Sequence, residues 1–172
     1  MKQNDLFGES LAQYRERLMV EIQVGTHCKA CDQWAKVYHN KFNSSMARTA
    51  ILLYGYCKKN PDEWLHCGDY LIQNHHQLKG VHGKLCRYEL MEKNKEAEPI
   101  NGAKSSGLYR MTEKGFAFVE ERITVPSYWT QYNGVTLHFD GDDIGIRDAL
   151  GKHFDYKELM REIGYWNEGE LL

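Results

Sequence analysis

Apolar residues recur every three to four positions in several stretches of the chain, the spacing that gathers them on one face of a helix. The first stretch predicts a helix over Glu9–Val24, with Ser10 as its N-cap. The second predicts a helix over Ser45–Lys58, because Asn43 can cap its first turn and Pro61 cannot continue it. Each helix has an apolar face that needs a partner to cover it.

Shorter elements are predicted after the second helix. Trp64–Cys67 reads as a strand, and Asp69 can cap a helix over Tyr70–Leu78. Gly80 ends that helix, and a further helix is expected over His82–Glu89. Two helices joined by a short turn with glycine are typical of the helix-turn-helix motif.

The middle of the chain predicts two strands separated by a polar loop. Glu92–Ser106 is too polar for a core and is expected to be the exposed tip between them. Gly107–Met111 is predicted to be the second strand, and Thr112–Glu121 a helix. A strand, a loop and a strand between Leu90 and Met111 would form a wing beside the helix-turn-helix.

The last third of the chain changes character. Ile123–Tyr132 is rich in β-branched and aromatic residues, and Asn133-Gly134 is a strong hairpin signal before Val135–Phe139. The remaining predictions are a turn at Asp140–Asp142, a short strand over Ile144–Arg147 and a closing helix over Phe154–Ile163.

The order of these elements predicts an α+β fold, namely a winged helix-turn-helix with a C-terminal β-hairpin or meander and a closing helix. We expect three parts: an N-terminal helix and cysteine knuckle in residues 1–42, the winged-helix domain in 43–122, and the meander with its helix in 123–172, packed on the winged helix. From the knuckle to Phe42 the chain is polar and is expected to be weakly helical.

One segment resembles a known family. Leu-Tyr-Arg-Met-Thr-Glu-Lys-Gly-Phe-Ala-Phe-Val at 108–119 is similar to the passage from wing to helix in winged-helix regulators of the multiple-antibiotic-resistance and phenolic-acid types. In those regulators Thr-x-x-Gly caps the helix after the wing. The resemblance spans about Ser44–Glu121. The stretch from Ile123 to Met160 also resembles uncharacterised phage and prophage proteins, which implies an origin in a mobile element.

The predicted helix-turn-helix and wing carry side chains suited to nucleic acid, since charged donors bind phosphate and base edges. The candidates are His82, Lys84, Arg87 and Tyr88 on the recognition helix, Lys93, Lys95 and Lys104 on the wing, and Arg48 at the opposite edge. The alternative is an ordinary solvated surface. Four glutamates crowd the same region and would repel phosphate: Glu89, Glu92, Glu96 and Glu98.

Charge is distributed unevenly although the net charge is only −2. Gln33–Pro61 contains five basic residues and no acidic one, whereas Arg110–Leu172 contains seven basic and twelve acidic residues. A basic front and an acidic rear suit a protein that meets phosphate with one side. Chance clustering on a solvated surface would give the same pattern.

Two of the five cysteines, Cys28 and Cys31, have the spacing of half a zinc site, and a closed structural site needs four ligands. His39 and Cys67 are the candidates for the others, with a partner subunit as a further source. Buried or inert thiols are the alternative. A redox role for the pair lacks the surrounding thioredoxin-like pattern.

The overall composition is that of a globular protein, with 27% charged and 42% hydrophobic residues. The chain has no apolar run long enough to span a bilayer and no signal peptide, so we expect a cytoplasmic protein without a membrane partner. No motif for catalysis stands out, and no enzyme is expected.

Two functions remain open at this stage. The first is a regulator that binds DNA through the helix-turn-helix, as a monomer or as a homodimer. The second is an adaptor or inhibitor that binds a protein of a host machine or defence system on the same scaffold. Such an adaptor would use exposed aromatic side chains, for which Trp129, Tyr132 and Trp166 are the candidates.

Overall fold

Asn43 starts α2 (Ser44–Lys59), because its side chain accepts a hydrogen bond from the backbone N–H of Met46. Ten of the 16 residues of α2 are buried, so the helix is covered around most of its surface. It is the longest of the described helices, and the prediction of a helix over Ser45–Lys58 is confirmed.

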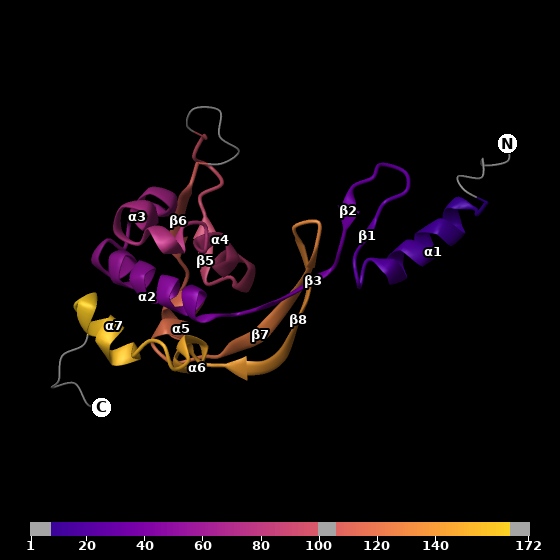
Figure 1. Ribbon diagram of the computed structural model, residues 1–172. Helices are drawn as coiled ribbons and strands as arrows, with labels where there is room; N and C mark the ends of the chain where they lie inside the picture. The colour runs from indigo at the N-terminus through magenta and orange to yellow at the C-terminus, as the bar shows by residue number, and fades with distance from the viewer. Residues whose placement is uncertain (1–7, 100–105, 166–172) are drawn as a thin grey trace. The chain divides into compact units, whose positions relative to one another are not determined.

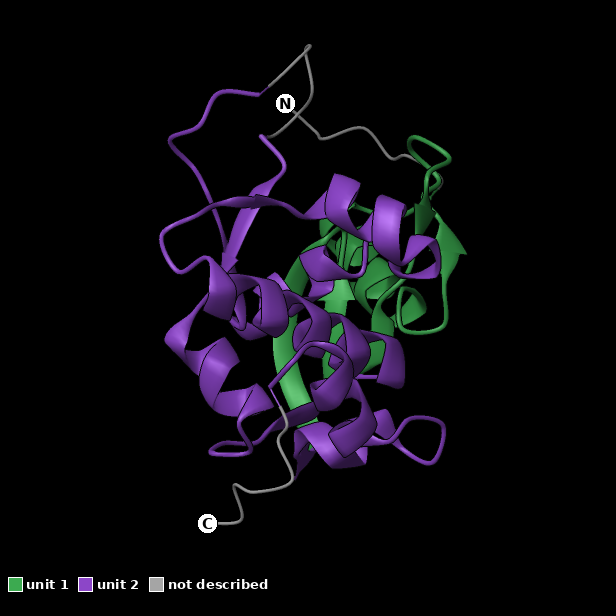
Figure 2. Cartoon of the chain, turned by 90° about the vertical axis from the view of Figure 1, so that its left-hand side faces the viewer, with its two compact units in different colours: residues 1–41, 128–141 green, residues 42–127, 142–172 purple. Residues whose placement is uncertain are grey.

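The computed structural model describes residues 8–99 and 106–165, which form helices and antiparallel strands (Figure 1). These residues divide into two units (Figure 2). Unit 1 consists of the described residues of 1–41 and 128–141, and unit 2 of those of 42–127 and 142–172. The expected α+β class is confirmed.

Short elements follow α2 in unit 2. They are β4 (Leu65–His66), α3 (Cys67–Asn74), a 3-10 turn (His76–Leu78), α4 (His82–Leu85) and a second 3-10 turn (Cys86–Tyr88). Gly80 has a φ of 78°, which suits glycine at the turn between α3 and α4. A single helix over His82–Glu89 was predicted, but α4 ends at Leu85. The 3-10 turn after it ends at the left-handed Glu89 (φ 60°).

Three strands of unit 2 form an antiparallel sheet in the order β4-β6-β5. β5 is Met91–Lys93 and β6 is Leu108–Met111, so the predicted pair of strands around a polar loop is confirmed. Opposite residues include Met91 with Met111 and Leu65 with Tyr109.

The helix predicted after β6 is also confirmed as α5 (Glu113–Val119). The hydroxyl of Thr112 accepts a hydrogen bond from the N–H of Gly115 at 3.0 Å, as expected of a Thr-x-x-Gly cap. Gly115 is buried against the carbonyl of Leu90, which leaves no room for a side chain.

Unit 2 ends with α6 (Ile146–Leu150) and α7 (Tyr156–Glu162), both packed on α2. The closing helix is thus confirmed, but the strand predicted over Ile144–Arg147 is wrong. Ile146, Ala149 and Leu150 are buried at helical spacing, and the N–H of Gly145 donates to the carboxylate of Asp148. That helix start outweighs the β-branched residues that suggested a strand.

In unit 1, α1 (Leu11–Glu21) begins at Ser10 as predicted. Ser10 and Gln13 form a capping box, in which each side chain binds the backbone of the other residue. Ile22, just after the helix, is buried, and its carbonyl accepts a hydrogen bond from Val37 N–H at 2.8 Å.

The expectation of a weakly helical stretch up to Phe42 is wrong. The chain forms an antiparallel hairpin of β1 (Thr26–His27) and β2 (Trp34–Ala35), followed by β3 (Tyr38–Lys41). Aromatic residues favour strands when partner strands are present. Here the pairing of β3 across the sheet outweighs the weak local preference for helix.

β3 joins β7 (Val125–Tyr132) and β8 (Val135–Ile144) in a sheet of order β3-β7-β8, in which β7 and β8 are the long orange strands of Figure 1. The turn at Asn133-Gly134 is confirmed, with φ angles of 47° and 78°. The turn predicted at Asp140–Asp142 is wrong, because β8 continues through it with Gly141 at a φ of 78°.

Among the residues that the structure describes, no helix combines the length and the apolar character needed to cross a membrane.

Replacing Gly115 with alanine should destabilise unit 2. A Cβ atom there would lie 2.1 Å from the carbonyl oxygen of Leu90, so the backbone must move. We expect a loss of about 1–3 kcal/mol in the free energy of unfolding, measured in urea. Gly83→Ala is the matched control, since nothing lies within 4 Å of its Cβ position. Equal stability of the two variants would contradict the close packing of Gly115 on the backbone of Leu90.

Candidate functional site

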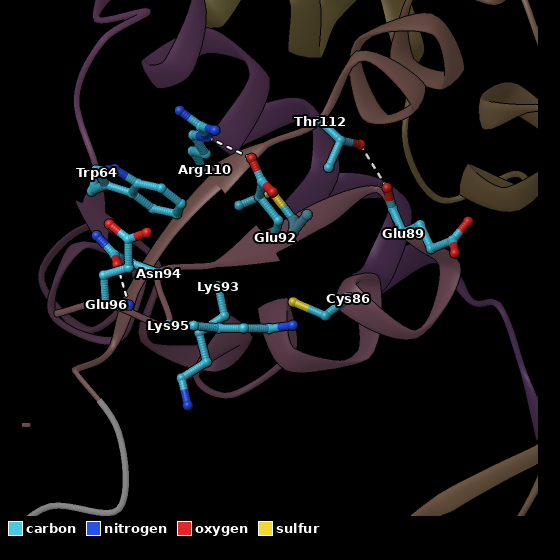
Figure 3. Close-up of a pocket in the computed structure, with 11 residues that line it drawn as sticks. Trp64, Cys86, Glu89, Glu92, Lys93, Asn94, Lys95, Glu96, Arg110 and Thr112 are labelled. Carbon is cyan, nitrogen blue, oxygen red and sulfur yellow. Dashed lines mark hydrogen bonds and ion pairs between the residues drawn. The ribbon is translucent and has the colours of Figure 1, made fainter. Parts of the chain in front are cut away.

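β5, β6 and the end of α4 border a groove in unit 2 with a volume of about 870 Å³ (Figure 3). We call it the β5–β6 groove. Its lining residues are Trp64, Cys86, Glu89, Met91, Glu92, Lys93, Asn94, Lys95, Glu96, Arg110 and Thr112. The groove brings together two of the lysines predicted to bind phosphate and three of the glutamates predicted to repel it.

One wall of the groove is built by a cation on an aromatic ring. The guanidinium of Arg110 lies 4.5 Å from the centre of the Trp64 ring. Its Nε donates to the carboxylate of Glu92 at 2.5 Å, across the β5–β6 pair (Figure 3). Sequence reasoning missed this wall, although opposite charges at facing positions of the predicted strands were a signal for it.

Glu89 closes the other end of the groove. Its left-handed backbone places its carbonyl to accept the Thr112 hydroxyl at 2.6 Å (Figure 3). Its carboxylate accepts from the Lys114 ammonium at 3.1 Å. Glu89 and Glu92, two of the four glutamates that weigh against phosphate binding, are therefore each paired with a cation.

The lysines around the groove lack such partners. Lys84 and Lys95 are exposed and Lys93 is half-buried. Within the described ranges 8–99 and 106–165, no carboxylate lies at ion-pair distance from any of the three. Lys104, the fourth lysine predicted to bind phosphate in this region, lies outside the described residues. Positive charge on this face is thus available to an external anion.

Other predicted contact residues are turned inward. Tyr88 is 2% exposed and meets the Phe42 ring edge-on, so it belongs to the core and offers no stacking surface. His82 is half-buried, with its ring against Tyr109. Arg87 is half-buried.

Arg48 is not brought to the groove. It projects from α2, and its guanidinium lies 5.1 Å from the centre of the Phe154 ring. Its buried Nε has no hydrogen-bond partner among the residues that the structure describes. Its positive charge contributes to lowering the pKa of His75, after the larger effect of burial.

Cys86 lies in the wall of the groove. Burial raises the pKa of its thiol to about 11, with the nearby Lys93 charge acting weakly in the opposite direction. A thiol with that pKa stays protonated at neutral pH and is a poor nucleophile. Nothing in this wall therefore favours cysteine chemistry.

The cysteine knuckle forms the loop between β1 and β2 in unit 1. The Tyr14 hydroxyl lies 3.4 Å from the Cys28 sulfur and donates to it. This bond and the backbone N–H groups of Ala30 and Cys31 lower the pKa of the Cys28 thiol to about 7. Tyr14 is a residue that sequence reasoning missed, and only its place on α1 brings it there.

His39 and Cys67, the other predicted metal ligands, are engaged elsewhere. His39 stacks on Tyr128, and its Nε2 lies 2.8 Å from the Asp140 carboxylate. Cys67 is fully buried at the start of α3, where burial raises the pKa of its thiol. The described part of the chain holds no group of three or more His, Cys, Asp or Glu side chains placed to bind a metal ion.

The aromatic residues expected to contact a protein partner differ in their exposure. Trp129 is 2% exposed and is a core residue, which is a correction to its expected exposure. Tyr132 is half-buried on β7, and Trp166 lies outside the described residues. Alternation along a predicted strand does not say which face is covered.

No protein-family model, curated protein or solved structure matches the chain.

Acid should destabilise unit 2 through His82. Burial, and then the charge of His66, lower the pKa of His82 below its usual value of 6.5. As the pH falls, the unfolded state binds a proton at His82 before the folded state does. The stability that a neutral His82 contributes is therefore present above about pH 6.5 and is lost below it. We expect the free energy of unfolding to fall between about pH 7.5 and 5.5, and to fall less in His82→Gln.

His76→Gln is the control, because His76 is exposed on the turn after α3. His75 shares the direction of the pKa change, so His82→Gln should reduce the pH dependence without removing it. The same pH dependence in wild type and His82→Gln would contradict the burial of a neutral His82 ring.

Proposed function

We propose that unit 2 is a winged helix-turn-helix module that binds duplex DNA, with α4 and the lysines of β5 and its loop facing the phosphates. The role is that of a non-catalytic regulator. The observation that carries the proposal is the availability of Lys84, Lys93 and Lys95, beside Glu89 and Glu92, which are paired with other cations.

The topology supports the scaffold. A helix, a strand, two helices and two strands follow one another, and the sheet order β4-β6-β5 puts the first strand beside the last. That arrangement sets α4 next to the β5–β6 pair, where a recognition helix and a wing would cooperate.

The short α4 determines the kind of contact. With four residues, followed by a 3-10 turn, it offers few side chains to the major groove. Lys84 is its exposed cation, whereas His82 is half-buried and Tyr88 is core. Contacts to phosphate should therefore supply most of the affinity, and base reading little.

Salt dependence tests the phosphate contacts. Lys93→Ala with Lys95→Ala should weaken binding to all duplex sequences and reduce the slope of log K against log salt by about 2. The reason is that a phosphate no longer contacted by a lysine keeps its bound counterions. Lys84→Ala should cost about 1–3 kcal/mol if it contacts a base edge. Fluorescence anisotropy with labelled duplexes measures both.

Lys152→Ala is the matched control, since it removes an exposed positive charge from the loop between α6 and α7. It should leave the salt slope within about 0.3 of wild type. Duplex binding no tighter than about 10⁻⁴ M at about 50 mM salt would reject the DNA proposal. A protein adaptor would then be the remaining function, with partner affinity that depends weakly on salt.

A further inference from the structure

The two cysteines of unit 1 sit in a tight backbone turn. The Cys28 carbonyl accepts the N–H groups of Cys31 at 3.3 Å and Asp32 at 2.7 Å, and Cys28 N–H donates to Gln33. Asp32 adopts a φ of 57° to close the turn. The turn places both cysteines in the short loop between β1 and β2.

Hydrogen-bond donors surround the sulfur of Cys28. The Tyr14 hydroxyl and the N–H groups of Ala30 and Cys31 all point at one sulfur. Zinc binds thiolates, and donors of this kind stabilise a thiolate both free and bound to metal. Cys31 is exposed, so the open side of the pair faces solvent.

One chain supplies only this pair. His27 has its Nδ1 3.0 Å from the Asp32 carbonyl, and His39 is held by Asp140. The described residues contain no third ligand beside the pair, and the residues outside them contain neither cysteine nor histidine. The other three cysteines belong to unit 2, where none is exposed. A closed four-ligand site therefore needs two more ligands from another molecule.

Two exposed aromatic side chains share a cavity with the cysteine pair. Trp34, 52% exposed, and Tyr38, 45% exposed, line a cavity of about 320 Å³ together with Cys28 and Cys31. Nine of the ten large apolar side chains that are exposed in the described structure belong to unit 1, the exception being Ile72. Exposed apolar side chains of this kind are available for contact with another molecule.

We propose that two copies of this chain associate through unit 1 and share one zinc ion, held by Cys28 and Cys31 of each copy. A twofold axis through the ion repeats the pair and completes a tetrahedral four-thiolate site. The site carries a charge of −2 from four thiolates and Zn²⁺. Lys36 lines the same cavity in each copy and offsets that charge. The proposal does not depend on DNA binding.

Zinc titration of the reduced, metal-free full chain tests the proposal. Light scattering on a sizing column gives the mass, and elemental analysis of the eluted peak gives the metal content. We expect a dimer that contains one zinc per two chains and returns to monomer with a chelator. Cobalt(II) in place of zinc should give the absorption of a tetrahedral four-thiolate site.

Cys31→Ser and Cys28→Ser should abolish zinc binding and the zinc-dependent dimer. Cys31 is exposed, so Cys31→Ser keeps the fold, which circular dichroism verifies. Cys86→Ser, a cysteine of unit 2, is the matched control and should behave as wild type. One zinc per monomer, no zinc in the reduced protein, or a dimer that survives both chelator and Cys31→Ser would overturn the proposal.

Discussion

The burial of α2 is the constraint on which unit 2 depends. Met46, Ala50 and Leu53 are fully buried on this helix, but so are Ala47, Thr49 and Ile51 on its other sides. A helix covered on all sides needs a layer around it, and α4, α5, α6 and α7 supply that layer with four to seven residues each. Elements this short are marginal alone, so packing on α2 rather than local propensity holds them.

The same constraint sets what the proposed DNA-binding face can offer. α4 ends early because Leu85 and Tyr88 are committed to the core, and Glu89 must turn left-handed to start β5. Few side chains of α4 are therefore exposed to solvent. Charge on this face has to come from lysines beyond the helix, on β5 and the loop after it, which is where Lys93 and Lys95 lie.

Local signals predicted the long helices and the hairpin turn of this chain. Asn43, Thr112 and Ser10 are caps whose hydrogen bonds reach only three residues ahead, and Asn133-Gly134 forms a two-residue turn. β3 was missed because its partner is 91 residues away, as in the pair His39–Thr130. Two contacts at the candidate sites likewise depend on tertiary structure. They are the ion pair of Glu89 with Lys114 and the hydrogen bond from the Tyr14 hydroxyl to the Cys28 sulfur.

The hydrogen bond between Phe42 N–H and the Ser127 carbonyl, 2.8 Å long, joins the two ends of the first segment of unit 2. β3 lies just before Phe42 and pairs with β7 around Ser127, so this bond fixes the chain ends from which the β3–β7 ladder starts. Closing a loop of that length costs entropy, and folding of residues 42–127 meets this cost beforehand. When residues 42–127 are folded, β3 and the start of β7 already lie side by side, so that pairing them closes no further loop. A substitution that unfolds residues 42–127 would therefore also raise the entropic cost of pairing β3 with β7.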